Sequence, residues 1–209
     1  MTSIKAYIQL LERMPDVNKE SKFATYISRA QNQVNKLDSL IADLLDISKI
    51  ENGKLKVNKK PFDIEALLVS AIETIYYTHS HINVKIEREG EVIAQQVNGD
   101  AFRIEQVLIN FLTNAIKYSP DSEKVVVHTQ AKGDHLYISV QDFGIGIPEH
   151  KKNNIFTKFY RVEESSVKFQ GLGIGLYICA EIIKQHNGTY GIESSSLQGT
   201  TFYFTIPFN

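Results

Sequence analysis

The chain has 209 residues, with 23 Lys and Arg against 24 Asp and Glu, so its net charge is close to zero. That balance gives no electrostatic reason to expect a nucleic acid or an anionic membrane as the main partner. One cysteine excludes an internal disulfide framework, and no apolar run approaches the length of about 20 residues that spans a bilayer. We therefore expect a cytoplasmic chain without membrane contact of its own, although a longer parent protein can still be membrane-bound.

Residues 1–53 carry apolar residues at helical spacing. Ile4, Ile8 and Leu11 form a short stripe, and a turn is predicted at residues 14–18 around Pro15. A second stripe advances in steps of three and four residues, which is typical of a heptad seam, and consists of Ile27, Ala30, Val34, Leu37, Ile41 and Leu44. Two such helices cannot enclose their own seams, so we predict a helical hairpin that completes a four-helix bundle with a second copy of the chain. The alternative is a hairpin that packs on the rest of the chain.

A change of pattern follows this hairpin. Residues 54–62 are short, polar and basic, and they are predicted to be a linker or a first edge strand at 55–57. Beyond them, the apolar periodicity predicts helices at residues 64–75, 101–118 and 171–185, the second with Asp100 as its N-cap. Predicted strands lie at residues 84–86, 124–129, 136–142, 191–194 and 201–206. The fold class is therefore α+β: a helical hairpin, and then an α/β sandwich of helices on a mixed sheet in residues 63–209.

Three glycines at alternate positions, Gly171, Gly173 and Gly175, open the last predicted helix. Glycine lets backbone amides approach a ligand closely, and a helix N-terminus presents unpaired N–H groups with partial positive charge. No Gly-Lys-Ser/Thr follows and no clear strand leads in, so the segment is neither a Walker loop nor a good dinucleotide fingerprint. It predicts a phosphate cradle, with a flexible hinge as the alternative. Cys179, in the same helix, is predicted to be an inert core thiol.

A second glycine-rich segment follows a predicted strand directly. Asp142 stands at the end of that strand, and Gly144, Gly146 and Ile147 come next. A carboxylate only accepts hydrogen bonds, so Asp142 is a good match for the exocyclic amine of adenine. The alternative is an ordinary Asp-Gly turn.

The helix predicted at residues 101–118 has one polar face. Asn110, Asn114, Lys117 and Tyr118 are spaced so that they share this face, and the opposite side is mostly apolar. Amide oxygens suit a hard cation such as Mg²⁺, and an ammonium suits phosphate. The face therefore predicts a site for a magnesium–phosphate group, with a solvated polar surface as the alternative.

Together these segments resemble the sensor histidine kinases of two-component systems. Residues 114–120 resemble the asparagine box of that family, 142–148 the first glycine box, 155–161 the phenylalanine box and 171–176 the second glycine box. Their order and spacing agree with the family, and residues 43–53 resemble the end of the second dimerisation helix. The resemblance covers almost the whole chain, and it implies that residues 63–209 form an ATP-binding domain of the gyrase and histidine-kinase type.

The resemblance also implies ATP and Mg²⁺ as cofactors and assigns roles to residues. Asn110 and Asn114 hold Mg²⁺ and phosphate oxygens, and Lys117 contacts phosphate. The remaining nucleotide contacts that it implies are Tyr118, Asp142 at the adenine amine, Gly144, Gly146 and Ile147 at the base, and Gly171, Leu172, Gly173, Ile174, Gly175 and Leu176 at the phosphates. Residues 163–170 are implied as a lid.

Three residues before the lid have open roles. Arg161 is either a catalytic contact to the γ-phosphate or a surface salt-bridge residue. Phe156 and Phe159 either pack the lid hinge, dock on the helical hairpin, or belong to the core.

The sequence departs from the family at the phosphate acceptor. Family members carry a histidine in the first dimerisation helix, but the first histidine here is His79. We therefore expect a piece of a longer kinase, beginning just after that site and unable to phosphorylate itself; the alternatives are a natural short form and a degenerate kinase. The other histidines have no ligand or acceptor spacing and are predicted to lie at the surface or in loops: His81, His128, His135, His150 and His186.

The predicted function is that of an ATP-dependent protein-histidine kinase core, with a second copy and a response regulator receiver domain as partners and no nucleic acid. The first alternative is an ATP-hydrolysing enzyme of the same fold. Such relatives place a water-activating glutamate four residues before the magnesium asparagine, where this chain has Asn110, and an amide cannot take a proton at neutral pH. The second alternative is a nucleotide-binding dimer module without transfer activity.

Overall fold

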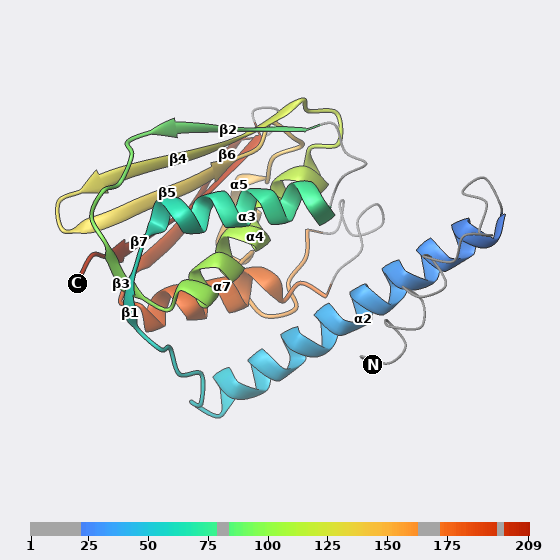
Figure 1. Cartoon of the computed structure of the whole chain (residues 1–209), viewed down its shortest axis with the longest axis horizontal. Helices are drawn as coiled ribbons and strands as arrows, with labels where there is room; N and C mark the ends of the chain where they lie inside the picture. The colour runs from blue at the N-terminus through green and yellow to red at the C-terminus, as the bar shows by residue number, and fades with distance from the viewer. Residues whose placement is uncertain (1–21, 79–83, 163–171, 196–198) are drawn as a thin grey trace. The chain divides into compact units, whose positions relative to one another are not determined.

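The computed structural model describes residues 22–78, 84–162, 172–195 and 199–209, and the chain divides into two compact units, Met1–Lys54 and Leu55–Asn209. The apolar stripe predicted at residues 4–11 and the turn predicted at 14–18 lie outside the described residues. In the first unit, the long helix α2 (Lys22–Glu51) carries the predicted heptad seam (Figure 1). Gly53 follows it with a φ of 62°, a left-handed conformation that ends helices and that glycine adopts at little cost.

The second half of the seam of α2 is exposed to solvent in the single chain, whereas Ile27 is buried and Val34 is half-buried. Leu37 and Leu44 are each 50% exposed and Ile41 is 39% exposed. These three leucine and isoleucine side chains recur at heptad spacing on one helix, which is the pattern of a helix that packs against further helices.

A five-stranded sheet forms the frame of the second unit (Figure 1). Its strands, in spatial order, are β2 (Lys85–Gly90), β4 (Lys124–Lys132), β5 (His135–Gln141), β7 (Gly199–Pro207) and β6 (Thr189–Ser195). Strand β2 runs parallel to β4, and the other pairs are antiparallel. A separate antiparallel pair joins β1 (Lys60–Phe62) to β3 (Val97–Gly99), which leads directly into α4.

Three helices cover one face of this sheet (Figure 1). Helix α4 (Ala101–Tyr118) packs on β4 and β5, α7 (Gly175–Gln185) packs on β6 and β7, and α3 (Ile64–Thr78) packs on α4. A short helix, α5 (Glu149–Lys152), lies beside β6. Among the described residues, no helix is long and apolar enough to cross a membrane. The predicted α+β class, with a helical segment followed by a sandwich on a mixed sheet, is confirmed.

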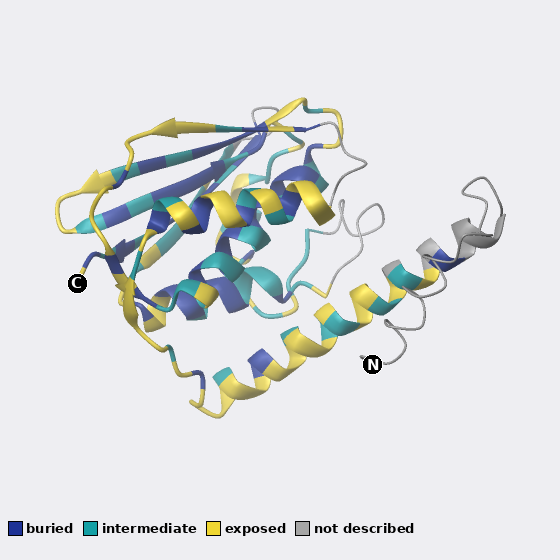
Figure 2. Ribbon diagram, viewed as in Figure 1, coloured by how far each residue is buried: buried dark blue, intermediate teal, exposed yellow. Residues whose placement is uncertain are grey.

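The core lies between the helices and the sheet. Along β7, Phe202, Phe204 and Ile206 are buried and alternate with half-buried residues, because successive side chains of a strand point to opposite faces. Phe111 of α4 is fully buried, and its ring lies 5.3 Å from Phe202 and 6.2 Å from Phe204. In Figure 2 the strands show the same alternation. Cys179 of α7 is buried as predicted.

Two of the predicted elements are wrong at their boundaries. Of the two alternatives for residues 54–62, the linker holds at residues 55–57 and the strand there does not. A strand forms instead at Lys60–Phe62, where β3 pairs in register, and β3 is too short to be predicted from its pattern. The helix predicted to start at Gly171 starts at Gly175. Gly173 has a φ of 70°, which is outside the right-handed helical region, so Gly173 belongs to a loop that leads into the helix.

Candidate functional site

The polar face of α4 is held away from the core by the burial of its opposite side. The buried stripe is Ile104, Val107, Leu108, Phe111, Leu112, Ala115 and Ile116. Asn110 and Asn114 are half-buried, and Nδ2 of Asn114 donates to Oδ1 of Asn110 at 2.9 Å. Nζ of Lys117 lies 4.9 Å from the centre of the Tyr118 ring. The four residues predicted to share this face therefore lie along it in the expected order.

The glycine loop meets this face at the start of α7. A Cβ on Gly175 would lie 2.2 Å from Nδ2 of Asn110, so a side chain at this position would displace the Asn110 amide. Ile174, the N-cap residue of α7, makes no side-chain capping bond, so its side chain satisfies none of the backbone N–H groups of the first turn. Ile174 itself is 1% exposed and anchors the loop in the core, whereas Leu172 is exposed and Leu176 is half-buried.

Gly173 brings the end of the phenylalanine segment to the same place. A Cβ on Gly173 would lie 2.5 Å from the carbonyl oxygen of Tyr160 and 2.9 Å from Cγ of Arg161. Burial raises the pKa of the Tyr118 hydroxyl, and the nearby positive charge of Arg161 acts in the opposite direction. Arg161 therefore lies within electrostatic reach of the C-terminal end of α4. Gly171 and the predicted lid at residues 163–170 lie outside the described residues.

Asp142 directly follows strand β5 and is 2% exposed. Its Oδ1 accepts the backbone N–H of Gly144 at 2.9 Å and that of Thr200 at 3.1 Å. Within the part of the chain that the structure describes, no protein donor reaches Oδ2, so this oxygen is available to a ligand. Burial raises the pKa of the Asp142 carboxyl, and the hydrogen bonds from Gly144 and Thr200 limit the rise.

The turn after Asp142 is fixed between two elements. A Cβ on Gly144 would lie 2.1 Å from the carbonyl oxygen of Tyr118, and the N–H of Ile145 donates to that same oxygen at 3.3 Å. Further along, Gly146 has a φ of 68°, and the N–H of Ile147 donates to Oγ of Ser194 on β6 at 2.8 Å. The turn therefore joins the C-terminal end of α4 to the edge of the sheet.

The two phenylalanines before the lid have different environments. The Phe156 ring lies 4.7 Å from the Tyr190 ring and 6.3 Å from the Phe202 ring, so Phe156 packs against the helix-covered face of β6 and β7. Phe159 is 57% exposed and has a φ of 63°, a left-handed conformation that is strained for an aromatic residue. Of the alternatives for this pair, core packing therefore holds for Phe156 and not for Phe159.

Three residues near these segments escaped the sequence analysis. Thr200 donates its backbone N–H to Asp142, and Ser194 accepts from Ile147 with its hydroxyl oxygen. Neither role has a signal in the residue pattern of a strand. The sequence predicts His186 at the surface or in a loop; His186 lies in the turn after α7, but it is buried there. His186 follows α7 as its C-cap residue and is 2% exposed, because both of its ring nitrogens make hydrogen bonds inside the domain.

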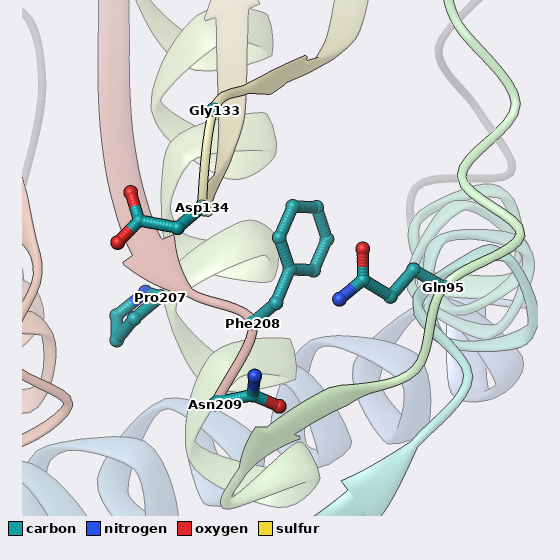
Figure 3. Close-up of a pocket in the computed structure, with 6 residues that line it drawn as sticks. All are labelled: Gln95, Gly133, Asp134, Pro207, Phe208 and Asn209. Carbon is teal, nitrogen blue, oxygen red and sulfur yellow. The ribbon is translucent and has the colours of Figure 1, made fainter.

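A small pocket of about 150 Å³ lies elsewhere, at the β4–β5 turn and the end of β7 (Figure 3). It is lined by Gln95, Gly133, Asp134, Pro207, Phe208 and Asn209. Gln95 faces the Phe208 ring, and the carboxylate of Asp134 points away from that ring. None of these residues belongs to the site predicted from the sequence.

Two protein-family models match the chain. Residues 99–209 match the family described as histidine kinase-, DNA gyrase B- and HSP90-like ATPase, which is more than half of the chain. Residues 1–53 match the His Kinase A (phospho-acceptor) domain. The first match contains all the residues predicted to contact nucleotide, and the second contains α2.

Curated relatives match over the full chain. The sensor protein kinase WalK of Staphylococcus haemolyticus is 31% identical over 99% of this chain and 34% of its own length. The sensor histidine kinase WalK of Bacillus subtilis is 31% identical over 100% of this chain and 34% of its own length. The chain thus spans about a third of the length of these relatives.

Solved structures show the same fold. The structure of full-length ShkA in complex with AMPPNP has a TM-score of 0.77 at 22% identity and covers 99% of this chain and 43% of its own. Acinetobacter baumannii histidine kinase AdeS has a TM-score of 0.72 at 24% identity, covering 100% of this chain and 95% of its own. The catalytic domain of histidine kinase ThkA has a TM-score of 0.63 at 29% identity and covers 72% of this chain and 96% of its own. With a phospho-acceptor segment first and an ATPase segment after it, the chain belongs to the sensor histidine kinases of two-component systems.

Proposed function

We propose that the chain is the ATP-dependent catalytic core of a protein-histidine kinase and that it transfers the γ-phosphate of ATP to a histidine outside these residues. The observation that carries the proposal is the meeting of Asn110 with Gly175, which brings the polar face of α4 to the amide-rich start of α7. A side-chain amide, a helix N-terminus and Arg161 at one place suit a triphosphate.

Adenine is read at the other end of this site. Oδ2 of Asp142 faces no protein donor among the described residues, and the exocyclic amine of adenine donates hydrogen bonds. Guanine has a carbonyl at the corresponding position, and a carbonyl beside a carboxylate is repelled. Thr200 and Gly144 hold Oδ1, so they orient the carboxylate for its ligand. Gly146 and Ile147 shape the turn around the base.

Magnesium fits the same face of α4. The amide oxygens of Asn110 and Asn114 are hard ligands, and Mg²⁺ is usually bound by one or two protein oxygens together with substrate phosphates. When bound, the ion neutralises charge that develops on the phosphates. Among the described residues no group of three His, Cys, Asp or Glu could hold a metal ion, so these two asparagines are the ligands we propose. Lys117 contributes a positive charge near the phosphates.

Transfer is favoured over hydrolysis by Asn110. A hydrolysing enzyme needs a base to take a proton from the attacking water, and an amide cannot do so at neutral pH. The residues of this site instead position ATP and neutralise its charge, which is the main contribution of a protein to phosphoryl transfer. We propose a reacting imidazole outside these residues, because residues 1–53, which match the phospho-acceptor domain, contain no histidine.

A transfer assay tests this proposal. The chain is incubated with γ-labelled ATP, with and without a peptide that supplies the histidine-bearing first dimerisation helix. We expect acid-labile, base-stable phosphate on the peptide and none on the chain alone. Release of free phosphate without transfer would support the ATPase alternative, and nucleotide binding without either reaction would support the binding module. Phosphohistidine formed by the unsupplemented chain would contradict the proposed source of the acceptor.

The exposed seam of α2 supports a homodimer through the N-terminal helices. We expect Leu37→Glu to produce monomers, because burying an unpaired carboxylate in an apolar seam costs several kcal/mol. Ser39→Glu is the matched control, since Ser39 is exposed and lies on the opposite side of α2. Sedimentation velocity at micromolar concentration measures both variants. An unmodified chain that is monomeric over this range would contradict the dimer for residues 1–209.

A response regulator is the second proposed partner. One solved relative is the complex of histidine kinase ThkA with response regulator protein TrrA, which covers 100% of this chain with a TM-score of 0.67. The equivalent partner of this chain is a receiver domain that takes the phosphate from the histidine.

A further inference from the structure

His186 is a buried histidine with both ring nitrogens engaged. Its Nδ1 lies 2.8 Å from the carbonyl oxygen of Ile182, and because a carbonyl only accepts, Nδ1 is the donor. Its Nε2 lies 2.9 Å from the backbone nitrogen of Asp100, whose N–H donates to it. The two bonds require the neutral ring with its proton on Nδ1. A Cβ on Gly99 would lie 3.0 Å from Cδ2 of His186, so the ring packs tightly against β3 as well.

Asp100, the partner of His186, joins three segments. Its Oδ1 accepts the N–H of Arg103 at 3.2 Å and so caps α4. Its Oδ2 accepts the N–H of Asn58 at 2.9 Å. Asn58 lies in the segment that follows α2 in the chain and precedes β1. The end of α7, the start of α4 and this connecting segment therefore meet at one aspartate.

We propose that His186 is a positioning residue for the nucleotide site. Its neutral ring holds the C-terminal end of α7 to the N-terminal end of α4 and, through Asp100, holds both helices to the connecting segment at Asn58. Gly175 at the N-terminal end of α7 meets Asn110 in the middle of α4, in the proposed site. The proposal rests on the proposed function in one respect: it takes α4 and α7 as the helices that bind nucleotide.

Protonation of His186 breaks this contact. A proton on Nε2 would face the N–H of Asp100, so two donors would oppose each other. The charged groups that act on the ring are Lys59 of the connecting segment, which disfavours protonation, and Asp100, which favours it. Burial is the largest effect and lowers the pKa of His186 below its ordinary value of 6.5. The contact is therefore complete above pH 6.5 and is lost as the pH falls through the lower pKa of the folded protein.

Nuclear magnetic resonance tests the contact directly, without nucleotide. The chain is titrated from about pH 8 to about pH 5 while the ring of His186 and the amides of Asp100 and Asn58 are followed. We expect both amide signals to move with the titration of the ring. In His186→Gln, whose amide can accept from Asp100 and donate to Ile182 but does not titrate, both amides should lose this movement. His128→Gln, which replaces a half-buried histidine on the opposite face of the sheet, should leave the movement unchanged.

Nucleotide affinity tests the consequence for the site. Magnesium–ADP binding is measured by calorimetry at neutral and at acidic pH for the unmodified chain, His186→Gln and His186→Ala. We expect His186→Ala to weaken binding about two- to thirtyfold at neutral pH. Acidification should weaken binding less in His186→Gln than in the unmodified chain. Because Asp142 is present in both proteins, its own protonation cancels in this comparison.

The amide titration and the binding measurement distinguish the positioning role of His186 from the proposed function. The positioning role is wrong if the amide signals of Asp100 and Asn58 do not move as His186 titrates. It is also wrong if these signals move with pH in the same way in His186→Gln. The role is likewise wrong if the affinity for magnesium–ADP changes equally with pH in the unmodified chain and in His186→Gln. A chain that binds no adenine nucleotide at any pH would overturn the proposed function, while the amide titration would still decide the contact. If His186→Ala does not fold, the glutamine variant and the unmodified chain decide the question.

Discussion

Asp142→Ala is expected to weaken ATP binding about tenfold to more than a hundredfold, because it removes a charge-assisted hydrogen bond worth roughly 1.5–3 kcal/mol. The structure shows that the two carboxylate oxygens of Asp142 have different environments. Oδ1 of Asp142 is already engaged by Gly144 and Thr200, so the variant loses the oriented oxygen Oδ2 as well as its charge. The preference for ATP over GTP should disappear in the same variant.

Calorimetry with ATP and GTP measures both effects. Asp134→Ala is the matched control, since Asp134 is an exposed aspartate at the β4–β5 turn, next to the pocket in Figure 3. Acidification should imitate the variant, because the pKa of Asp142 is raised above 3.8 by burial and its protonated form loses the charge. Binding should therefore weaken as the pH falls through this raised pKa. Equal affinity of the unmodified chain for ATP and GTP would remove the adenine-reading role.

Gly199→Ala is expected to destabilise the second unit by about 2–5 kcal/mol. Gly199 has a φ of 83°, and a side chain in the left-handed region costs about 1–2 kcal/mol. In addition, the new Cβ would lie 2.0 Å from the carbonyl oxygen of Asp142 and 2.7 Å from Cα of Phe143. Both atoms are backbone, so they cannot rotate away, and relief by backbone shifts costs about 1–3 kcal/mol more.

Gly133→Ala separates these two contributions. Gly133 has a φ of 64°, but nothing lies within 4 Å of its added Cβ. Gly133→Ala is therefore destabilised only by the left-handed backbone conformation, without a steric clash. Urea unfolding followed by tyrosine fluorescence measures the free energy of unfolding of both variants. Because the clash falls on Asp142, Gly199→Ala should also weaken ATP binding, whereas Gly133→Ala should not. Equal destabilisation by the two variants would contradict the close approach of β7 to Asp142.

The sequence by itself determined the local elements and the face on which the asparagines lie. The apolar stripe of α4 repeats with the helical period, so burial of that stripe leaves Asn110 and Asn114 on the other side. The alternation in β7 likewise predicts which residues face the helices, and Asp100 before α4 is a recognisable N-cap. These features depend on neighbours within one or two turns of helix or along one strand, so the residue pattern is sufficient to predict them.

Only the tertiary structure decided which distant residues meet. Thr200 reaches Asp142 because β5 and β7 pair in one register, and a shift by one residue would turn their side chains to the other face. Gly175 reaches Asn110, and His186 reaches Asp100, because α7 and α4 pack side by side on the sheet. Hydrogen bonds and close approaches of this kind depend on how separate elements pack, and a one-dimensional pattern contains no record of that packing. The buried role of His186 was therefore invisible in the sequence, although the helix that it follows was not.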